Sequence, residues 1–237
     1  SMKRIAVLVD FTGVCEMAIA HAGLVAQQSL AELILLHVAP SEQKDEEEEL
    51  NDEVHIYGET LQMKGIPFKI EVAFGDLFAD LPNILAALEV DLVVVGTHGM
   101  RGLQRNLYAE NILKLINSMQ VLTLVVQGGS DVPNGGYKNL LLPVMDRVYS
   151  INKADLLANF AGIFNSTLHV LNFIFEDDED GLSTDHIEVI KSQFKQLGRP
   201  LNYHHKTTSV NINTYSQSIA QLANLEDCQL IVWVVPA

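Results

Sequence analysis

The chain reads Asp91-Leu-Val-Val-Val-Gly-Thr-His-Gly-Met-Arg-Gly-Leu-Gln-Arg-Asn-Leu-Tyr-Ala-Glu110 at the point that decides its fold. The apolar start of this stretch predicts a buried strand over 91–95, and its end leads into a helical pattern at 106–118. A glycine-bearing turn between strand and helix is where an α/β fold presents backbone N–H groups to an anion. Gly96 and Gly99 fit that role, so the stretch predicts a phosphate-binding turn.

The residues of this turn also have structural interpretations. Gly96 and Gly99 suit a tight turn that holds no ligand, because glycine adopts backbone conformations that other residues avoid. Arg101 and Arg105 are cations that suit a phosphate, or surface arginines that pair with the many carboxylates of the chain. His98 lies in the same loop, where it is able to stack or titrate.

The chain contains two copies of one pattern. Three pairs of segments match: Lys3–Asp10 with Lys138–Asp146, Leu33–Val38 with Ser166–Val170, and Asp91–Val95 with Gln229–Trp233. The offset between matched segments stays between 132 and 138 residues. A period of that length indicates two tandem domains rather than a solenoid.

Strands and helices alternate along the first copy. The pattern predicts strands at 3–9, 33–39, 68–73, 91–95 and 121–126, separated by helices at 14–30, 46–64, 77–89 and 106–118. Apolar strands between helices predict a parallel sheet covered on both faces, and right-handed crossovers make it doubly wound. We therefore expect an α/β fold with domains at 3–127 and 137–237, joined by a glycine-rich linker at 128–136.

The second copy stops early. It ends at Val234-Val-Pro-Ala237, where the first copy continues with Gly96-Thr-His-Gly99, and no later helix or fifth strand follows. The second domain is therefore predicted to be truncated or degenerate at its C-terminus, without the glycine motif. The sheet edge left open in this way must be covered or paired.

Composition excludes several classes of protein. A formal net charge of −15 argues against a nucleic-acid binder, which carries a basic face, and against a protein of anionic membrane surfaces. The sequence has no apolar run long enough to span a bilayer and no secretory signal. Cys15 and Cys228 are the only cysteines, which fits a reducing compartment better than a disulfide framework. We expect a cytoplasmic protein.

With these elements in place, the chain resembles the universal stress protein family in its tandem two-domain form. The most specific part of the match is Val93–Leu107, and Val7–Asp10 and Leu36–Val38 agree with it. The resemblance implies a parallel sheet of strand order 3-2-1-4-5, with the last strand missing from the second domain. It also implies self-association, as a pseudo-dimer of the two domains and as a homodimer, and a protein partner that the sequence does not identify.

In the ATP-binding branch of that family the motif is Gly-x-x-Gly, nine residues, and then Gly-Ser or Gly-Thr. The closing pair here is Ala109-Glu110, a departure at both positions. Ala109 adds a methyl group where glycine lets the chain approach a phosphate, and ionised Glu110 has no proton to donate to it. The resemblance therefore implies at most weak binding of ATP or another adenine nucleotide, in the first domain, at Asp10, Val38, Val95, Gly96, His98, Gly99, Arg101, Ala109 and Glu110.

The individual polar residues leave alternatives open. Asp10 follows the first strand, where it suits a ligand or caps the next helix. His37 and His169, at the ends of matched strands, are predicted to be structural. The spacing of His186, His204 and His205 matches no zinc ligand set, so no metal is predicted.

Three functions compete on these observations. The first is a non-catalytic stress-response or regulatory module with one weak nucleotide site, and it is the function we favour. The second is a protein-interaction module without a ligand. The third is a nucleotide hydrolase in which Glu110 binds a magnesium ion. The sequence near Glu110 offers no second clear carboxylate ligand for that ion. No catalytic set is legible in the order of the sequence.

Overall fold

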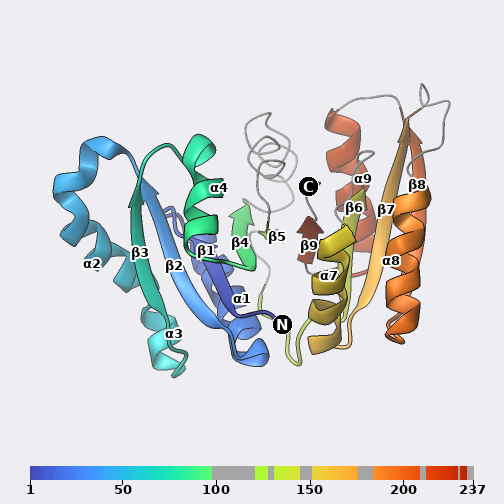
Figure 1. Ribbon diagram of the computed structural model, residues 1–237, viewed down its shortest axis with the longest axis horizontal. Coiled ribbons are helices and arrows are strands. Elements are labelled where there is room, and N and C mark those ends of the chain that lie inside the picture. The colour runs from blue at the N-terminus through green and yellow to red at the C-terminus, as the bar shows by residue number, and fades with distance from the viewer. Residues whose placement is uncertain are drawn as a thin grey trace.

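The computed structural model describes residues 1–97, 121–127, 131–144, 151–175, 184–208, 212–228 and 230–233. Its first half contains β1 (Arg4–Leu8), α1 (Gly13–Ser29), β2 (Glu32–Ala39), η1 (Ser41–Glu46), α2 (Glu47–Tyr57), α3 (Glu59–Met63), β3 (Lys69–Phe74), α4 (Leu77–Ala87), β4 (Leu92–Thr97) and β5 (Leu122–Gln127). Its second half contains β6 (Asn139–Val144), α7 (Ile151–Ile163), β7 (Thr167–Phe175), α8 (Thr184–Gln196), β8 (Leu201–Thr208), α9 (Ile212–Leu225) and β9 (Leu230–Trp233) (Figure 1).

The nine strands that the structure describes form one sheet, in the order β3-β2-β1-β4-β5-β9-β6-β7-β8. The order 3-2-1-4-5 expected for the first half is confirmed, and the second half repeats its first four positions. Strands pair in parallel within each half, whereas β5 and β9 pair antiparallel, with Val125 opposite Ile231. The edge that the second half leaves open at β9 is therefore covered by β5 of the first half.

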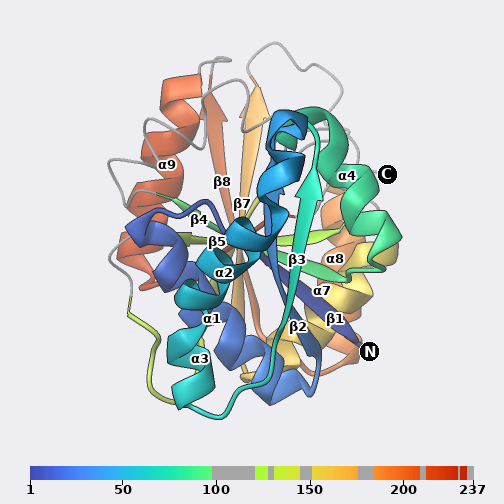
Figure 2. The same cartoon turned by 90° about the vertical axis from the view of Figure 1, so that its left-hand side faces the viewer.

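Alternate residues of the strands face two apolar clusters, one on each side of the sheet. Val7 and Leu35 belong to the cluster that packs under α1, α7 and α8. Ala6 and Leu36, their neighbours in the chain, belong to the cluster under α4 and α9. Figure 2 shows α1 and α3 on one side of the first half and α4 on the other. In Figure 1 α1 lies behind the sheet while α7 and α8 lie in front, because a sheet of this width twists strongly.

A second contact between the halves lies beside the strand junction. His21 of α1 and Tyr137, which precedes β6, are 1% and 0% exposed. The His21 Nδ1 and the Tyr137 hydroxyl share a hydrogen bond of 2.7 Å. Tyr137 also meets the ring of Phe164 edge-on, with 5.0 Å between ring centroids. One aromatic side chain thus packs against both halves of the molecule.

One part of the sequence repeat is wrong. The match of Lys3 with Lys138 aligns Ala6 with Leu141. The sequence match of the second strands aligns His37 with His169, but the strand pairing does not agree with that alignment. Ala6 pairs with Ile34, whereas Leu141 pairs with His169. His169 is thus the counterpart of Ile34 and lies near the start of β7, because β7 extends beyond the apolar core that suggested the match.

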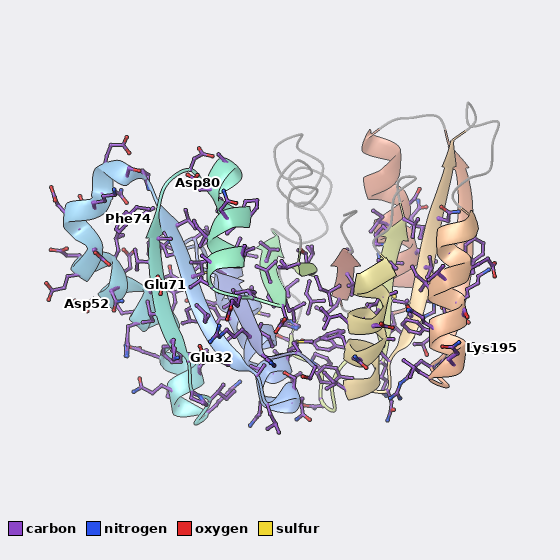
Figure 3. The ribbon with its side chains drawn as sticks, viewed as in Figure 1. Glu32, Asp52, Glu71, Phe74, Asp80 and Lys195 are labelled. Atoms are coloured by element: carbon purple, nitrogen blue, oxygen red, sulfur yellow. The ribbon has the colours of Figure 1, made fainter. Side chains whose placement is uncertain are left out.

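The predicted helix at 46–64 is divided. Residues 41–46 form a 3-10 turn, and α2 ends at Tyr57 before α3 starts at Glu59. At Gly58 the helix passes so close to the sheet that an added Cβ would lie 2.6 Å from the Phe68 ring. The acidic residues Glu47, Glu48 and Glu49 form the exposed first turn of α2, and the nearby Asp52 also points outward (Figure 3).

Several predictions fall on other parts of the chain. The predicted helix at 106–118, the acidic run at 176–180, Asp146 and the terminal Val234–Ala237 lie outside the described residues. Residues 131–136 of the expected linker contain neither helix nor strand. Within the described ranges, no helix is long and apolar enough to cross a membrane.

Candidate functional site

Three of the predicted site residues meet at the carboxyl edge of the first-half sheet. β1, β2 and β4 are parallel neighbours, so their carboxyl ends lie side by side. Asp10 follows β1, Val38 is the penultimate residue of β2, and Val95 precedes Gly96 in β4. Gly96 is the fourth predicted residue that the structure describes, and the remaining five, His98, Gly99, Arg101, Ala109 and Glu110, lie outside the described residues.

The Asp10 carboxylate stabilises the turn that leads into α1. Its Oδ1 accepts hydrogen bonds from the Thr12 backbone N–H at 3.1 Å and from the Thr12 hydroxyl at 2.5 Å. Thr12 is the residue before α1, so Asp10 orders the approach to the helix without capping its first turn. Such local bonding is typical of aspartate in turns. Asp10 is exposed to solvent. Of its two carboxylate oxygens, only Oδ1 accepts a hydrogen bond from the described residues.

An aromatic group that the sequence did not reveal lies next to this turn. The Phe11 ring centroid is 4.2 Å from that of His37 and 5.6 Å from that of Tyr57. The Tyr57 hydroxyl donates to the Phe11 carbonyl at 2.6 Å, and His37 Nδ1 donates to the Val9 carbonyl at 2.6 Å. His37 is therefore structural, as expected, and the group fixes the end of β1 against β2 and α2.

Beyond the end of β1, one main-chain position of β2 has no partner on the β1 side among the described residues. The Val9 N–H donates to the Leu36 carbonyl, so the backbone of every second residue, Leu36 and then Val38, faces β1. The Val9 carbonyl, the next acceptor along β1, is bonded by the His37 ring instead. Within the described part of the chain, no main-chain bond from the β1 side reaches Val38. Its N–H and C=O are thus one donor and one acceptor at the carboxyl edge.

Gly96 has a packing role that differs from the expected turn. It lies inside β4 opposite Val126, because the strand extends past the predicted end at 95. A Cβ at Gly96 would lie 2.9 Å from the Val14 carbonyl oxygen and 3.3 Å from the Ala18 Cβ. A Cβ atom cannot lie this close to a backbone oxygen unless α1 or β4 moves. Gly96 is glycine because α1 crosses β4 at this point.

We expect Gly96→Ala to lower the free energy of unfolding by about 1–3 kcal/mol through overpacking, whether or not a nucleotide is present. Urea unfolding measures this change. Gly13→Ala is the matched control, since a Cβ at Gly13 meets no atom within 4 Å. A Gly96→Ala protein as stable as its parent would mean that α1 does not require glycine here.

A hollow of about 870 Å³ lies at the opposite, amino end of the strands. Arg4, Glu89 and Asp91, three of its charged residues, already have partners. Arg4 pairs with Glu89 at 3.0 Å, and the Asp91 carboxylate accepts the backbone N–H groups of Lys3 and Arg4 at 2.7 and 3.0 Å. Carboxylates that tie the start of β1 to β4 are poorly placed to receive an anionic ligand, so we favour the carboxyl edge.

Comparison with known proteins places this geometry in a family context. Residues 2–127 match the model of the universal stress protein family, while no curated protein matches the sequence. A universal stress protein from Archaeoglobus fulgidus DSM 4304 has 13% identity and a TM-score of 0.61, covering 99% of this chain and 96% of its own. A candidate universal stress protein from Pseudomonas aeruginosa UCBPP-PA14 has 16% identity and a TM-score of 0.57, covering 100% and 94%. These two structures share the fold over both halves.

Proposed function

Because the chain belongs to the universal stress protein family, we propose that it is a non-catalytic, cytoplasmic stress-response module whose first half binds one adenine nucleotide weakly. Phosphate contacts would fall on the residues that follow β4. Among them Gly99 and Arg101 favour a phosphate, whereas Ala109 and Glu110 oppose it. The nucleoside part is supported by the residues at the ends of β1, β2 and β4.

The observation that carries the proposal is the main chain of Val38, which no main-chain hydrogen bond from the β1 side reaches within the described residues. The Watson–Crick edge of adenine offers one acceptor and, on its amino group, one donor, which complement a backbone N–H and C=O of one residue. Backbone groups of this kind fix ligand orientation in otherwise apolar pockets. Val38 and Val95 are half-buried and pack on one apolar cluster, which suits the faces of a purine. Asp10 Oδ2 is the acceptor that we propose for a ribose hydroxyl.

Calorimetric titration with ATP, ADP and AMP tests this site. We expect one weak site per chain for the parent protein. Val38→Pro removes the N–H donor and is expected to abolish binding, whereas Val38→Ile retains the donor and is expected to bind like the parent. Thermal unfolding of each variant without nucleotide separates a lost ligand contact from a lost fold.

Equal affinity in the Val38→Pro and Val38→Ile proteins would remove the adenine contact from the proposal. If no nucleotide binds the parent, Ala109→Gly with Glu110→Ser distinguishes the two remaining cases. Binding gained by that variant would support a protein whose nucleoside site is intact and whose phosphate site is impaired by Ala109 and Glu110. No gain would favour the ligand-free interaction module, and steady ATP hydrolysis by the parent would favour the hydrolase.

A further inference from the structure

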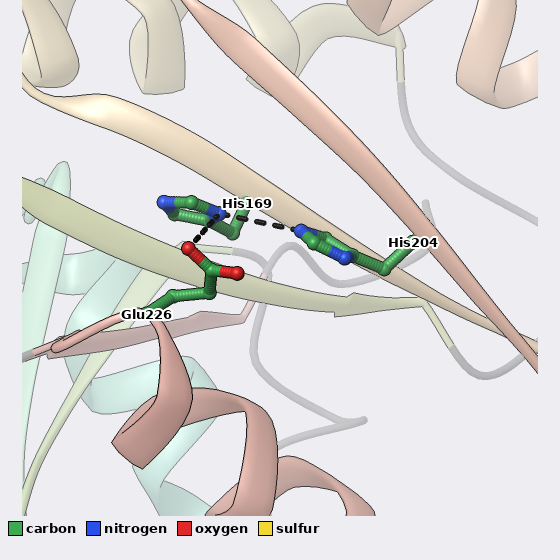
Figure 4. Close-up of side chains that lie close together, drawn as sticks. All are labelled: His169, His204 and Glu226. Atoms are coloured by element: carbon green, nitrogen blue, oxygen red, sulfur yellow. Dashed lines mark hydrogen bonds and ion pairs between the residues drawn. The ribbon is translucent and has the colours of Figure 1, made fainter.

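Three side chains that can bind a metal meet in the second half, apart from the carboxyl edge of the first-half sheet. His169 lies on β7, His204 on β8, and Glu226 directly follows α9 (Figure 4). His169 Nδ1 is 3.3 Å from His204 Nε2 and 3.9 Å from Glu226 Oε2. One potential ligand atom from each residue lies within 4.8 Å of the others, and His169 is 2% exposed.

The hydrogen bond on the far side of the His169 ring decides where its proton lies. His169 Nε2 is 3.0 Å from the Asn139 side-chain oxygen, which only accepts, so Nε2 carries the proton and donates it. In the neutral ring Nδ1 then carries a lone pair, and it faces His204 and Glu226. A metal-bound histidine almost always donates its other N–H to such an acceptor, so Asn139 occupies the position of an outer partner.

Because His169 Nε2 donates to Asn139, its Nδ1 accepts the 3.3 Å hydrogen bond from His204 Nε2, and the Glu226 carboxylate lies 3.9 Å from the same nitrogen. Nδ1 of a neutral ring and an ionised carboxylate are both acceptors, and their arrangement favours a cation in the space that they share.

We propose that His169, His204 and Glu226 bind one zinc ion. Two histidines and a glutamate form a known zinc ligand set, and zinc–nitrogen bonds of about 2.0–2.1 Å place ligand atoms about 3.3 Å apart in a tetrahedral site. The two ring nitrogens are already separated by 3.3 Å, and Glu226, whose side chain is 32% exposed, has freedom to approach. Nitrogen ligands disfavour magnesium and calcium, which prefer oxygen.

The set is particular to the second half. Strand registers place Ile34 opposite Ala6 and His169 opposite Leu141, and they place Glu71 and His204 at matched positions of β3 and β8. The first half therefore has an apolar side chain where the second has its buried histidine. A buried histidine at this position is therefore not a requirement of the fold that the two halves share.

Titration of the untagged full chain with Zn²⁺ and with Co²⁺ tests the site. We expect one ion per chain, a rise in the midpoint of thermal unfolding, and the visible absorption of tetrahedral Co²⁺. Glu226→Gln and His204→Gln, which change partly exposed groups, are expected to abolish the absorption. Asn139→Leu removes the outer partner and is expected to weaken binding by about 10–100-fold.

His55→Ala is the matched control, because it removes an exposed histidine of α2 in the first half and is expected to bind one ion as before. Circular dichroism without metal establishes that each variant is folded. One ion bound equally by the parent, Glu226→Gln and His204→Gln proteins would overturn the proposal, as would a parent chain that binds neither metal.

Discussion

Replacing Tyr137 by alanine is expected to lower the free energy of unfolding by about 3–5 kcal/mol, the range for truncating a large buried aromatic side chain. Tyr137 is 0% exposed and packs against both halves, through the hydrogen bond to His21 and the ring of Phe164. Its loss opens a cavity and leaves the buried His21 ring without this partner. Chemical denaturation of the parent and the variant measures the difference.

Tyr137→Phe separates the ring from the hydroxyl. It retains the contact with Phe164 and is expected to cost about 1–3 kcal/mol, because a polar atom of buried His21 loses a hydrogen bond. Trp233, the single tryptophan, lies in β9 opposite Thr123, so its fluorescence is a probe attached to one strand of the junction. Coincident loss of fluorescence and circular dichroism in the parent, and separate transitions in Tyr137→Ala, would show that Tyr137 couples the halves. A cost below about 1 kcal/mol for alanine would contradict its role.

The sequence predicts the individual elements well because each is decided locally. Apolar runs between helical patterns locate the strands of the first half, and their order is what the family resemblance implies. What joins the halves is not local. Nothing near Tyr137 marks His21 as its partner, since the two residues lie on opposite sides of the expected linker. The pairing of β5 with β9 is likewise not marked by any motif in the sequence.

The candidate sites show the same division. Asp10, Val38 and Val95 are found from sequence because parallel strands end at one edge. The packing role of Gly96 is not, because it depends on the side on which α1 crosses β4. The spacing of His204 from His186 and His205 matches no zinc ligand set, so the sequence alone predicts no metal there. Its neighbours in space, His169 and Glu226, come from the strand before it and from a helix after it, and only the crossovers bring them together.

A chain that ends at Gln127 is expected to self-associate through β5. In the intact molecule β5 lies between β4 and β9, and Leu122, Leu124 and Val125 are at most 1% exposed. Removing the second half turns this apolar strand into a free edge, which is a template for pairing with another chain. Two copies paired antiparallel at β5 would restore the arrangement that β9 provides.

The outer edge of the same fragment is protected by charge. β3 alternates exposed Lys69 and Glu71 with half-buried residues, and Glu71 is visible on that outer strand in Figure 3. Charged residues on an edge strand oppose pairing, so association is expected at β5 and not at β3. The free edge differs from β3 in this respect, because Leu122–Gln127 contains no charged residue.

Light scattering and hydrogen exchange test this expectation together. The fragment is expected to have the mass of two chains, with amides of β5 protected at high concentration and exposed on dilution. Amides of β3 serve as the internal control, since their exchange is expected to be independent of concentration. The full chain at the same concentration is expected to keep β5 protected on dilution, because β9 is covalently attached. A folded fragment that remains a monomer, with rapidly exchanging β5 amides, would contradict the view that the uncovered strand requires a partner.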